Sequence, residues 1–254
     1  MSDKVLTRRH GRVLSIVINR PQVRNAIDTE TSEGIAAALM QLDGDSTLAA
    51  GVISGAGTGF CAGMDLKAFL AGERPAVEGR GFAGIVQSPP EKPLVAAIEG
   101  HALAGGFEIA LCCDLLVASE SAVFGLPEVR RGLMAGGGGL LRLPRRVPHN
   151  MAMEWILTGR HVGAAEAERW GLVNRLVPDG TALDEALRLA ETIAENGPLA
   201  LRGSKQVVEQ SGDWSASEAF TRQQEIYEPV RSSADAQEGA RAFKEKRSPR
   251  WTGQ

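Results

Sequence analysis

The sequence lacks any apolar run long enough to cross a membrane. A spanning helix needs about 18 such residues, and the longest stretches of this 254-residue chain, such as residues 94–98, are far shorter. The first four residues also lack the apolar segment of a secretory signal peptide. Neither sign of charge dominates, because 28 Lys and Arg stand against 31 Asp and Glu. We therefore expect a cytoplasmic protein that binds neither membranes nor nucleic acid.

Cysteine, histidine and aromatic residues are also scarce. The three cysteines include the neighbours Cys112 and Cys113 and form no Cys-x-x-Cys motif, which is typical of reduced thiols in the cytosol. The four histidines have none of the spacings of a helical zinc site, so we expect no metal. Glycine, by contrast, is abundant, with 30 residues. Glycine is needed where the backbone turns sharply or comes close to a ligand.

Short β-type runs alternate with helical segments in the first half of the chain. Strands are expected at residues 13–19, 50–54, 93–98 and 115–118, and helices at 29–42, 66–70 and 105–113. A polar, Gly-rich stretch at 71–84 is expected to be a mobile loop. Beyond residue 136 the pattern is helical apart from one expected strand at 172–177, with helices expected at 138–146, 150–157, 164–170, 184–195, 199–210, 217–228 and 234–246. The alternation predicts one α/β domain with a helical extension.

Two loops are candidates for binding a negatively charged oxygen. Residues 60–66 (FCAGMDL) and 101–108 (HALAGGFE) each connect an expected strand to an expected helix, where backbone N–H groups have no partner within the helix. Gly105 and Gly106 would let the backbone approach a ligand closely. Each loop alone is equally well explained as an ordinary strand–helix connection. Together, two N–H donors that converge on one point would form an oxyanion hole.

Two glutamates are candidates for acid–base chemistry. Glu108 lies in the first turn of an expected helix among apolar neighbours, where burial would raise the pKa of its carboxyl. Alternatively, it only complements the helix dipole. Glu128 ends the run Phe124-Gly-Leu-Pro-Glu, and by itself it is more readily explained as a solvated turn residue.

Other motifs are excluded or weak. Gly55 and Gly57 lack the third glycine of a dinucleotide fingerprint, and no phosphate loop or nucleophile elbow occurs. The glycine tract at residues 136–139 is interpreted as a helix start, and His101 as a loop residue. Arginines gather between residues 129 and 153, and basic residues at the C-terminus. They are either a solvated face or a site that neutralises a polyanionic ligand.

The order and spacing of these motifs resemble the enoyl-CoA hydratase/isomerase (crotonase) superfamily over nearly the whole chain. The segments that carry the resemblance are Asn19-Arg-Pro, Arg24-Asn-Ala-Ile, residues 60–66, Gly100-His-Ala-Leu-Ala-Gly-Gly-Phe-Glu, Phe124-Gly-Leu-Pro-Glu, residues 136–144 and Trp170-Gly-Leu-Val-Asn. The resemblance implies an α/β fold whose core (residues 1–195) is a crotonase-like spiral of ββα turns. It also implies a helical trimerisation region (residues 196–254) within the same structural unit. The expected assembly is a homotrimer or a dimer of trimers.

By the same resemblance, the backbone N–H groups of Met64 and Gly105 form the oxyanion hole, and Glu108 and Glu128 are the catalytic acids. The substrate is an acyl-CoA, and CoA is part of this substrate, so no separate cofactor or metal is expected. Residues expected to contact CoA or substrate are Arg24, Ala26, Ala62, Asp65, Leu66, Lys67, Gly106, Pro127 and Lys246, the last of them from a neighbouring subunit.

Within the family, residues 154–160, 168–175 and 238–251 are most similar to the carnitinyl-CoA dehydratase branch. Both acids are present, which favours hydration or dehydration. Δ3–Δ2 isomerisation, for which many relatives keep only the second acid, stays open, as does non-catalytic acyl-CoA binding. Met64 stands where many hydratases have a small residue, and His101 where they often have Tyr, which leaves the acyl preference undecided.

Overall fold

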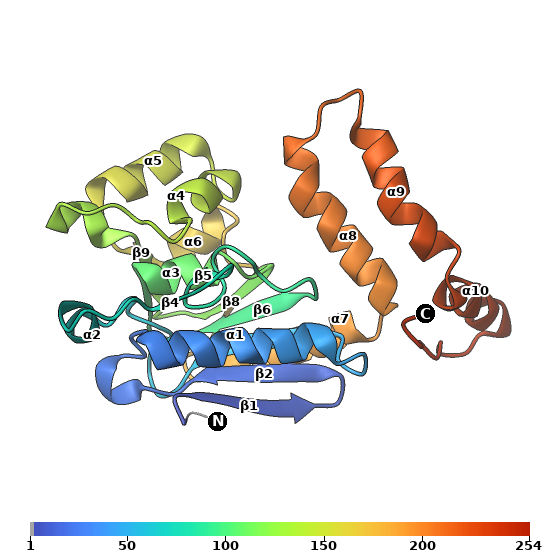
Figure 1. Ribbon diagram of the computed structural model, residues 1–254, viewed down its shortest axis with the longest axis horizontal. Coiled ribbons are helices and arrows are strands. Elements are labelled where there is room, and N and C mark those ends of the chain that lie inside the picture. Colours follow the sequence, from blue (N-terminus) through green and yellow to red (C-terminus); the bar gives the residue numbers. More distant parts are fainter. Residues whose placement is uncertain (1–2) are drawn as a thin grey trace.

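The computed structural model describes residues 3–254, and its centre is a six-stranded sheet (Figure 1). The strand order is β1-β2-β3-β6-β8-β11; β1 is antiparallel to β2, and the other neighbours are parallel. The strands are β1 (Val5–His10), β2 (Val13–Ile18), β3 (Ala50–Gly55), β6 (Leu94–Ile98), β8 (Leu115–Ser119) and β11 (Arg175–Val177). The inner strands carry mostly apolar residues that are buried on both faces, as parallel sheets between helices require.

A second, smaller sheet continues the same chain path. It joins β7 (His101–Leu103), β9 (Val123–Gly125) and β10 (Val162–Gly163). Cys61 extends it through an isolated bridge to Ala102. Each passage of the chain thus adds one strand to the large sheet, a strand or bridge to the small sheet, and then a helical turn. This repeating ββα path is the expected spiral.

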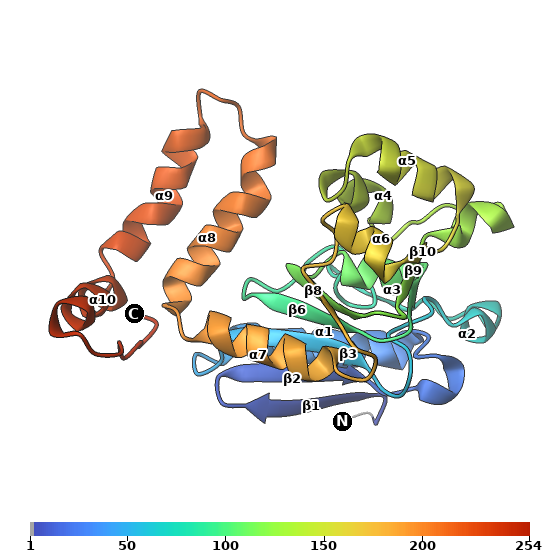
Figure 2. The same cartoon turned by 180° about the vertical axis from the view of Figure 1, so that it is seen from behind.

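Helices cover both faces of the large sheet (Figures 1 and 2). The helices of the core are α1 (Thr29–Gly44), α2 (Leu66–Leu70), α3 (Gly105–Ala110), α4 (Gly139–Arg142), α5 (His149–Thr158), α6 (Ala164–Arg169) and α7 (Ala182–Ala194). Because strand side chains alternate, the residues on one face pack under α7, and those on the other pack with α1 and α3. Asp28 is the N-cap of α1, and its side chain accepts a hydrogen bond from the Thr31 N–H.

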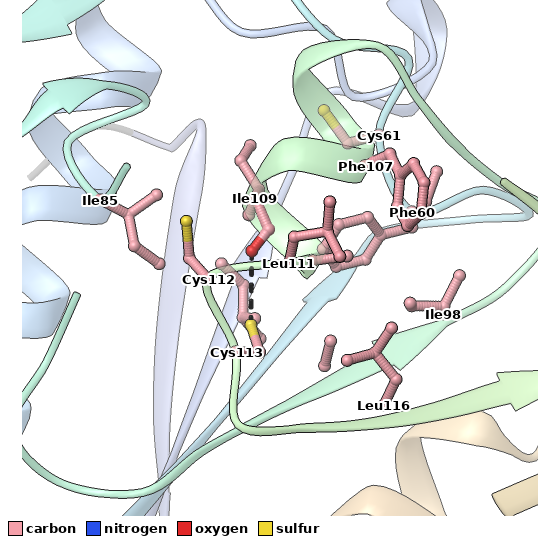
Figure 3. Packing of buried hydrophobic residues seen from close by; sticks show 14 of the residues in the cluster. Phe60, Cys61, Ile85, Ile98, Phe107, Ile109, Leu111, Cys112, Cys113 and Leu116 are labelled. Carbon is pink, nitrogen blue, oxygen red and sulfur yellow. Dashed lines mark hydrogen bonds between the residues drawn. The ribbon is translucent and has the colours of Figure 1, made fainter. Parts of the chain in front are cut away.

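The larger part of the core surrounds α3 (Figure 3). Phe107 and Ile109 of this helix are packed among apolar side chains of the sheet. Cys61, Cys112 and Cys113 are buried in the same cluster as free thiols, and the Cys113 thiol donates a 3.5 Å hydrogen bond to the carbonyl oxygen of Ile109. The core therefore packs around α3 and the residues that follow it. This packing also holds the N-terminal end of the helix in place.

The last three helices project from the core as a separate arm (Figure 1). They are α8 (Pro198–Gln210), α9 (Ala219–Arg231) and α10 (Ala234–Glu245). The arm carries large apolar side chains that are mostly exposed, among them Val208 (76%), Phe220 (82%) and Phe243 (89%). Among residues 3–254, no helix is both long and apolar enough to cross a membrane.

The structure departs from the sequence expectations in a few elements. It adds β1, and it places His101 at the start of β7, so the interpretation of His101 as a loop residue is wrong. Helix α3 ends at Ala110 instead of residue 113, because the N–H groups of Cys112 and Cys113 bond three residues back, to Ile109 and Ala110. The stretch 71–84 contains a two-stranded hairpin of β4 (Ala76–Val77) and β5 (Gly81–Phe82).

Candidate active site

Three connections from successive turns of the spiral lie side by side. The Leu103 N–H donates to the Cys61 carbonyl (3.0 Å), and the Ala104 N–H donates to the Gly125 carbonyl (2.9 Å). These bonds align the chain that leads to Met64, the chain that enters α3, and the chain that leads to Glu128. The structure therefore brings the two expected oxyanion loops and both expected acids to one edge of the small sheet.

The two expected N–H donors are neighbours in space. A Cβ atom built on Gly63 would lie 2.9 Å from the Gly105 nitrogen, and Gly63 has a φ of +95°, so glycine suits this position both sterically and conformationally. Ala104, which precedes Gly105, is held at φ 50° and ψ −128°, a region that non-glycine residues rarely adopt. Within residues 3–254, neither the Met64 N–H nor the Gly105 N–H has a hydrogen-bond partner. This pair of groups is suited to bind one carbonyl oxygen.

Glu108 is buried, with 4% of its surface exposed, in the first turn of α3. Its Oε1 accepts a 2.9 Å hydrogen bond from the Gly139 N–H. Burial raises the pKa of the carboxyl above its usual value of 4.5, against the opposing effect of N–H groups from Gly139 and Gly137 and of the Arg142 charge. A carboxyl in these surroundings titrates nearer to neutral pH, where it can act as a base.

Glu128 follows Pro127 in the 3₁₀ turn Pro127–Arg131. Its Oε2 is buried without a hydrogen-bond partner among the described residues. Burial raises the pKa of this carboxyl, and the negative charge of Glu108 raises it further. The two acids are thus close enough to interact electrostatically. Two interacting carboxyls with raised pKa values are typical of a site in which one is ionised and the other protonated.

The glycine tract that precedes α4 has a second role that the sequence interpretation missed. The tract does start α4, at Gly139. Its backbone also surrounds the Glu108 carboxylate: a Cβ on Gly137 would lie 2.6 Å from Oε2, and one on Gly139 would lie 3.2 Å from Oε1. Only residues without side chains allow the backbone this close. The run of four glycines is the feature of the sequence that could have indicated this close approach of the backbone to a side chain.

Phe82 of the β4–β5 hairpin was also missed. A Cβ on Gly105 would lie 2.5 Å from the Phe82 ring, so the ring covers the α-carbon of Gly105. The hairpin is held by Arg80, whose guanidinium donates to the carbonyls of Gly84 (2.7 Å) and Ser88 (2.8 Å). The stretch expected to be a loop therefore forms part of the wall beside Gly105. No sequence pattern indicated this contact.

Most of the residues expected to bind CoA gather beside Met64. The Ala62 N–H donates to the Arg24 carbonyl (3.0 Å), which places the segment of Arg24 and Ala26 against the oxyanion loop. Leu66 and Lys67 begin α2 and are exposed. Arg24 is also exposed, so its guanidinium and the Lys67 ammonium are accessible to an anion.

Four other expected contacts have a different environment. Lys246 ends α10 in the arm, far from α2 and α3 of the same chain (Figures 1 and 2). Gly106 packs so tightly on the Cys61 backbone that a side chain would overlap it, and Pro127 is buried. The Asp65 carboxylate faces inward, where it caps α2 and pairs with Arg20. Within residues 3–254, no group of His, Cys, Asp and Glu could hold a metal ion.

The sequence profile described as enoyl-CoA hydratase/isomerase matches residues 8–254. The chain belongs to the enoyl-CoA hydratase/isomerase family. Carnitinyl-CoA dehydratase from Proteus mirabilis is 41% identical over the full length of both chains. A solved structure of enoyl-CoA hydratase from Mycobacterium tuberculosis is 53% identical, covers both chains completely and superposes with a TM-score of 0.98. Carnitinyl-CoA hydratase from Mycobacterium avium is 42% identical, with complete coverage and a TM-score of 0.79.

These similarities confirm the family and the crotonase-like α/β fold that the sequence predicts. They also confirm the resemblance to carnitinyl-CoA dehydratases, which extends over the whole chain. The candidate site of this family member is thus assembled from successive turns of one spiral. The roles of its individual residues stay predictions.

Proposed function

We propose that this chain is an enoyl-CoA hydratase, a hydro-lyase that reversibly adds water across the 2,3 double bond of an acyl-CoA thioester. One observation carries the proposal: the turns of the spiral bring two partner-free N–H groups together with a buried carboxyl, Glu108, and a partly buried one, Glu128, and both carboxyls have raised pKa values. The first pair is suited to a carbonyl oxygen that gains negative charge, and the second to moving two protons.

In the proposed mechanism, the N–H groups of Met64 and Gly105 bind the thioester oxygen. Glu108, ionised, accepts a proton from water while the hydroxyl adds to C3. The π electrons shift to give an enolate, whose oxygen is stabilised by the two donors. Glu128, protonated, then delivers a proton to C2, and dehydration follows the same path backwards. The reaction needs no separate cofactor, because CoA is part of the substrate.

The proposed substrate is a simple 2-enoyl-CoA, supported by the 53% identity to a solved enoyl-CoA hydratase against 41% to a carnitinyl-CoA dehydratase. Carnitinyl-CoA dehydration is the second candidate, supported by full-length similarity to that enzyme. We expect the ultraviolet absorbance of the conjugated thioester to fall when the protein is mixed with crotonyl-CoA, and to fall more slowly with crotonobetainyl-CoA. The reverse order would select the second candidate. Turnover of a 3-enoyl-CoA alone would select the Δ3–Δ2 isomerase.

We further propose that the chain assembles as a homotrimer or a dimer of trimers through the helical arm. Exposed apolar side chains such as Phe220 and Phe243 support this, because association would remove them from water. In such an assembly, Lys246 would meet the CoA of a neighbouring subunit. We expect sedimentation velocity to give a trimer or hexamer, and Phe220→Asp to reduce its proportion. A monomeric wild-type protein at micromolar concentration would contradict the proposal.

A further inference from the structure

Arg20 has no place in the proposed chemistry, yet its side chain is only 12% exposed and lies between two carboxylates. One nitrogen, Nη2, is 3.0 Å from Asp65 Oδ2 and 3.1 Å from Asp28 Oδ2. The other, Nη1, donates to the Ala26 carbonyl. The guanidinium thus joins the segment 26–28 to the residue that follows Met64.

The same two segments determine the direction of the Met64 N–H. The Ile27 N–H donates to the Gly63 carbonyl (2.8 Å), and the Asp65 N–H donates to the Ile27 carbonyl (2.9 Å). The Gly63 carbonyl and the Met64 N–H belong to one trans peptide group, so they point in opposite directions. Because the carbonyl is held toward Ile27, the N–H is aimed away from Ile27. Any rotation of segment 26–28 against Asp65 would turn this N–H.

Arg20 holds both sides of this arrangement. Ala26 and Asp28 flank Ile27, and Asp65 follows Met64. The contacts of Arg20 with these three residues therefore lie on either side of the two backbone hydrogen bonds that orient the Gly63–Met64 peptide group. The remaining carboxylate oxygen of Asp65 accepts from the N–H groups of Lys67 (3.0 Å) and Ala68 (3.3 Å) and fixes the start of α2. We propose that Arg20 is a positioning residue, which clamps segment 26–28 to Asp65 and thereby aims the Met64 N–H at the thioester oxygen. This inference rests on the proposed oxyanion role of Met64.

The clamp requires the shape of a guanidinium as well as its charge. A planar fork reaches the Ala26 carbonyl with one nitrogen and the two carboxylates with the other, whereas an ammonium is a single point on a flexible stem. Arg20→Lys therefore keeps a positive charge beside Asp65 and beside Asp28, which Lys4 also contacts (2.8 Å), but loses part of the clamp. Asp65→Asn removes the charge partner and keeps the oxygen that caps α2, because Asn is as good an N-cap as Asp.

The test uses acetoacetyl-CoA, whose enolate absorbs in the near ultraviolet and carries its negative charge largely on oxygen. Two well-aimed N–H groups favour the bound enolate and lower the pKa at which it forms. We expect Arg20→Lys to lower the enolate fraction of bound acetoacetyl-CoA and kcat for crotonyl-CoA by about 10- to 100-fold, with KM changed by less than about threefold. Asp65→Asn should behave alike, and the double variant should be no worse than the poorer single variant.

Arg175→Lys is the matched control, because Arg175 pairs with Glu185 of α7, on the sheet face opposite α3. It should leave both readouts unchanged. If wild-type protein does not favour the enolate, the proposed oxyanion hole itself fails. If wild type favours it and either single variant forms the same enolate fraction, or the two effects add, the positioning role is overturned. Asp65→Asn decides the question should Arg20→Lys not fold.

Discussion

Glu108→Gln is expected to reduce kcat for hydration of crotonyl-CoA by about 1,000-fold, within the range of general acid–base catalysis. The amide has almost the same shape as the carboxylate, and its oxygen can still accept the hydrogen bond from the Gly139 N–H. It has no useful basicity, so it cannot take the proton from the attacking water. The loss of thioester absorbance measures the rate, and binding of CoA should be preserved.

The control is Glu168→Gln, which changes an exposed carboxylate on α6 and should leave turnover at the wild-type level. Glu128→Gln should be as damaging as Glu108→Gln if both acids serve hydration. A Δ3–Δ2 isomerase, in contrast, would depend on Glu128 alone. Normal turnover in both variants would therefore contradict the hydratase proposal, and a loss confined to Glu128→Gln would replace it with the isomerase.

The thermal stability of Glu108→Gln shows whether lost activity reflects lost structure. Burial raises the pKa of Glu108, so the folded protein holds this proton more tightly than the unfolded chain does. The stabilisation from this group is therefore complete at low pH and is lost as the pH rises through the raised pKa. Glutamine carries no charge at any pH. We expect its melting temperature at neutral pH to equal or exceed that of the wild type.

Gly137→Ala is expected to reduce kcat by about 100-fold while the fold survives, because a displacement of about 1 Å at a reacting group can cost that much. The new Cβ would lie 2.6 Å from Glu108 Oε2, too close for both to stay in place. The far end of a side chain moves more easily than backbone, so the carboxylate should give way. The rate of crotonyl-CoA hydration and the melting temperature, measured together, distinguish a displaced carboxylate from a loss of folding.

The adjacent glycine provides the control for that variant. A Cβ on Gly136 meets nothing within 4 Å, so Gly136→Ala makes the same chemical change without touching Glu108. It should retain wild-type turnover. Equal activity of the two alanine variants would show that the tract only starts α4. Equal loss in both would show that backbone flexibility, rather than room for the carboxylate, is what the glycines provide.

Most elements of the fold could be predicted from the sequence because their side chains are buried in regular patterns. Strands β2, β3 and β6 are nearly continuous apolar runs, since helices cover both faces of the sheet. Strand β1 was missed because it lies at the edge of the sheet and buries only Val5. Strand β7 was missed because its three residues pair with β9 and Cys61, partners that are distant along the chain.

The candidate site, like the fold, could be predicted from the sequence only in part. The two candidate loops and Glu108 follow local cues, namely a loop that leads into a helix start and a carboxylate among apolar neighbours. The choice of the Met64 and Gly105 N–H groups, and of Glu128 as the second acid, rests on the family resemblance. The contact between Glu108 and Gly139 spans 31 residues, and that between Arg20 and Asp65 spans 45. No local pattern reports such pairs. These contacts form because different turns of the spiral lie next to each other in the folded chain, so only the structure shows them.

The two expected oxyanion donors are main-chain atoms, whereas the two expected acids are side chains. Substitution at residue 108 or 128 would therefore change the proton chemistry in one step and leave the carbonyl-binding groups in place, because every residue except proline keeps its backbone N–H. In a scaffold of this kind, the carbonyl-binding N–H groups persist through substitutions, whereas the acid–base side chains can change. If the proposed roles hold, activation of the thioester would be retained by default, and new reactions on the same CoA substrates would arise by exchanging one carboxyl at a time.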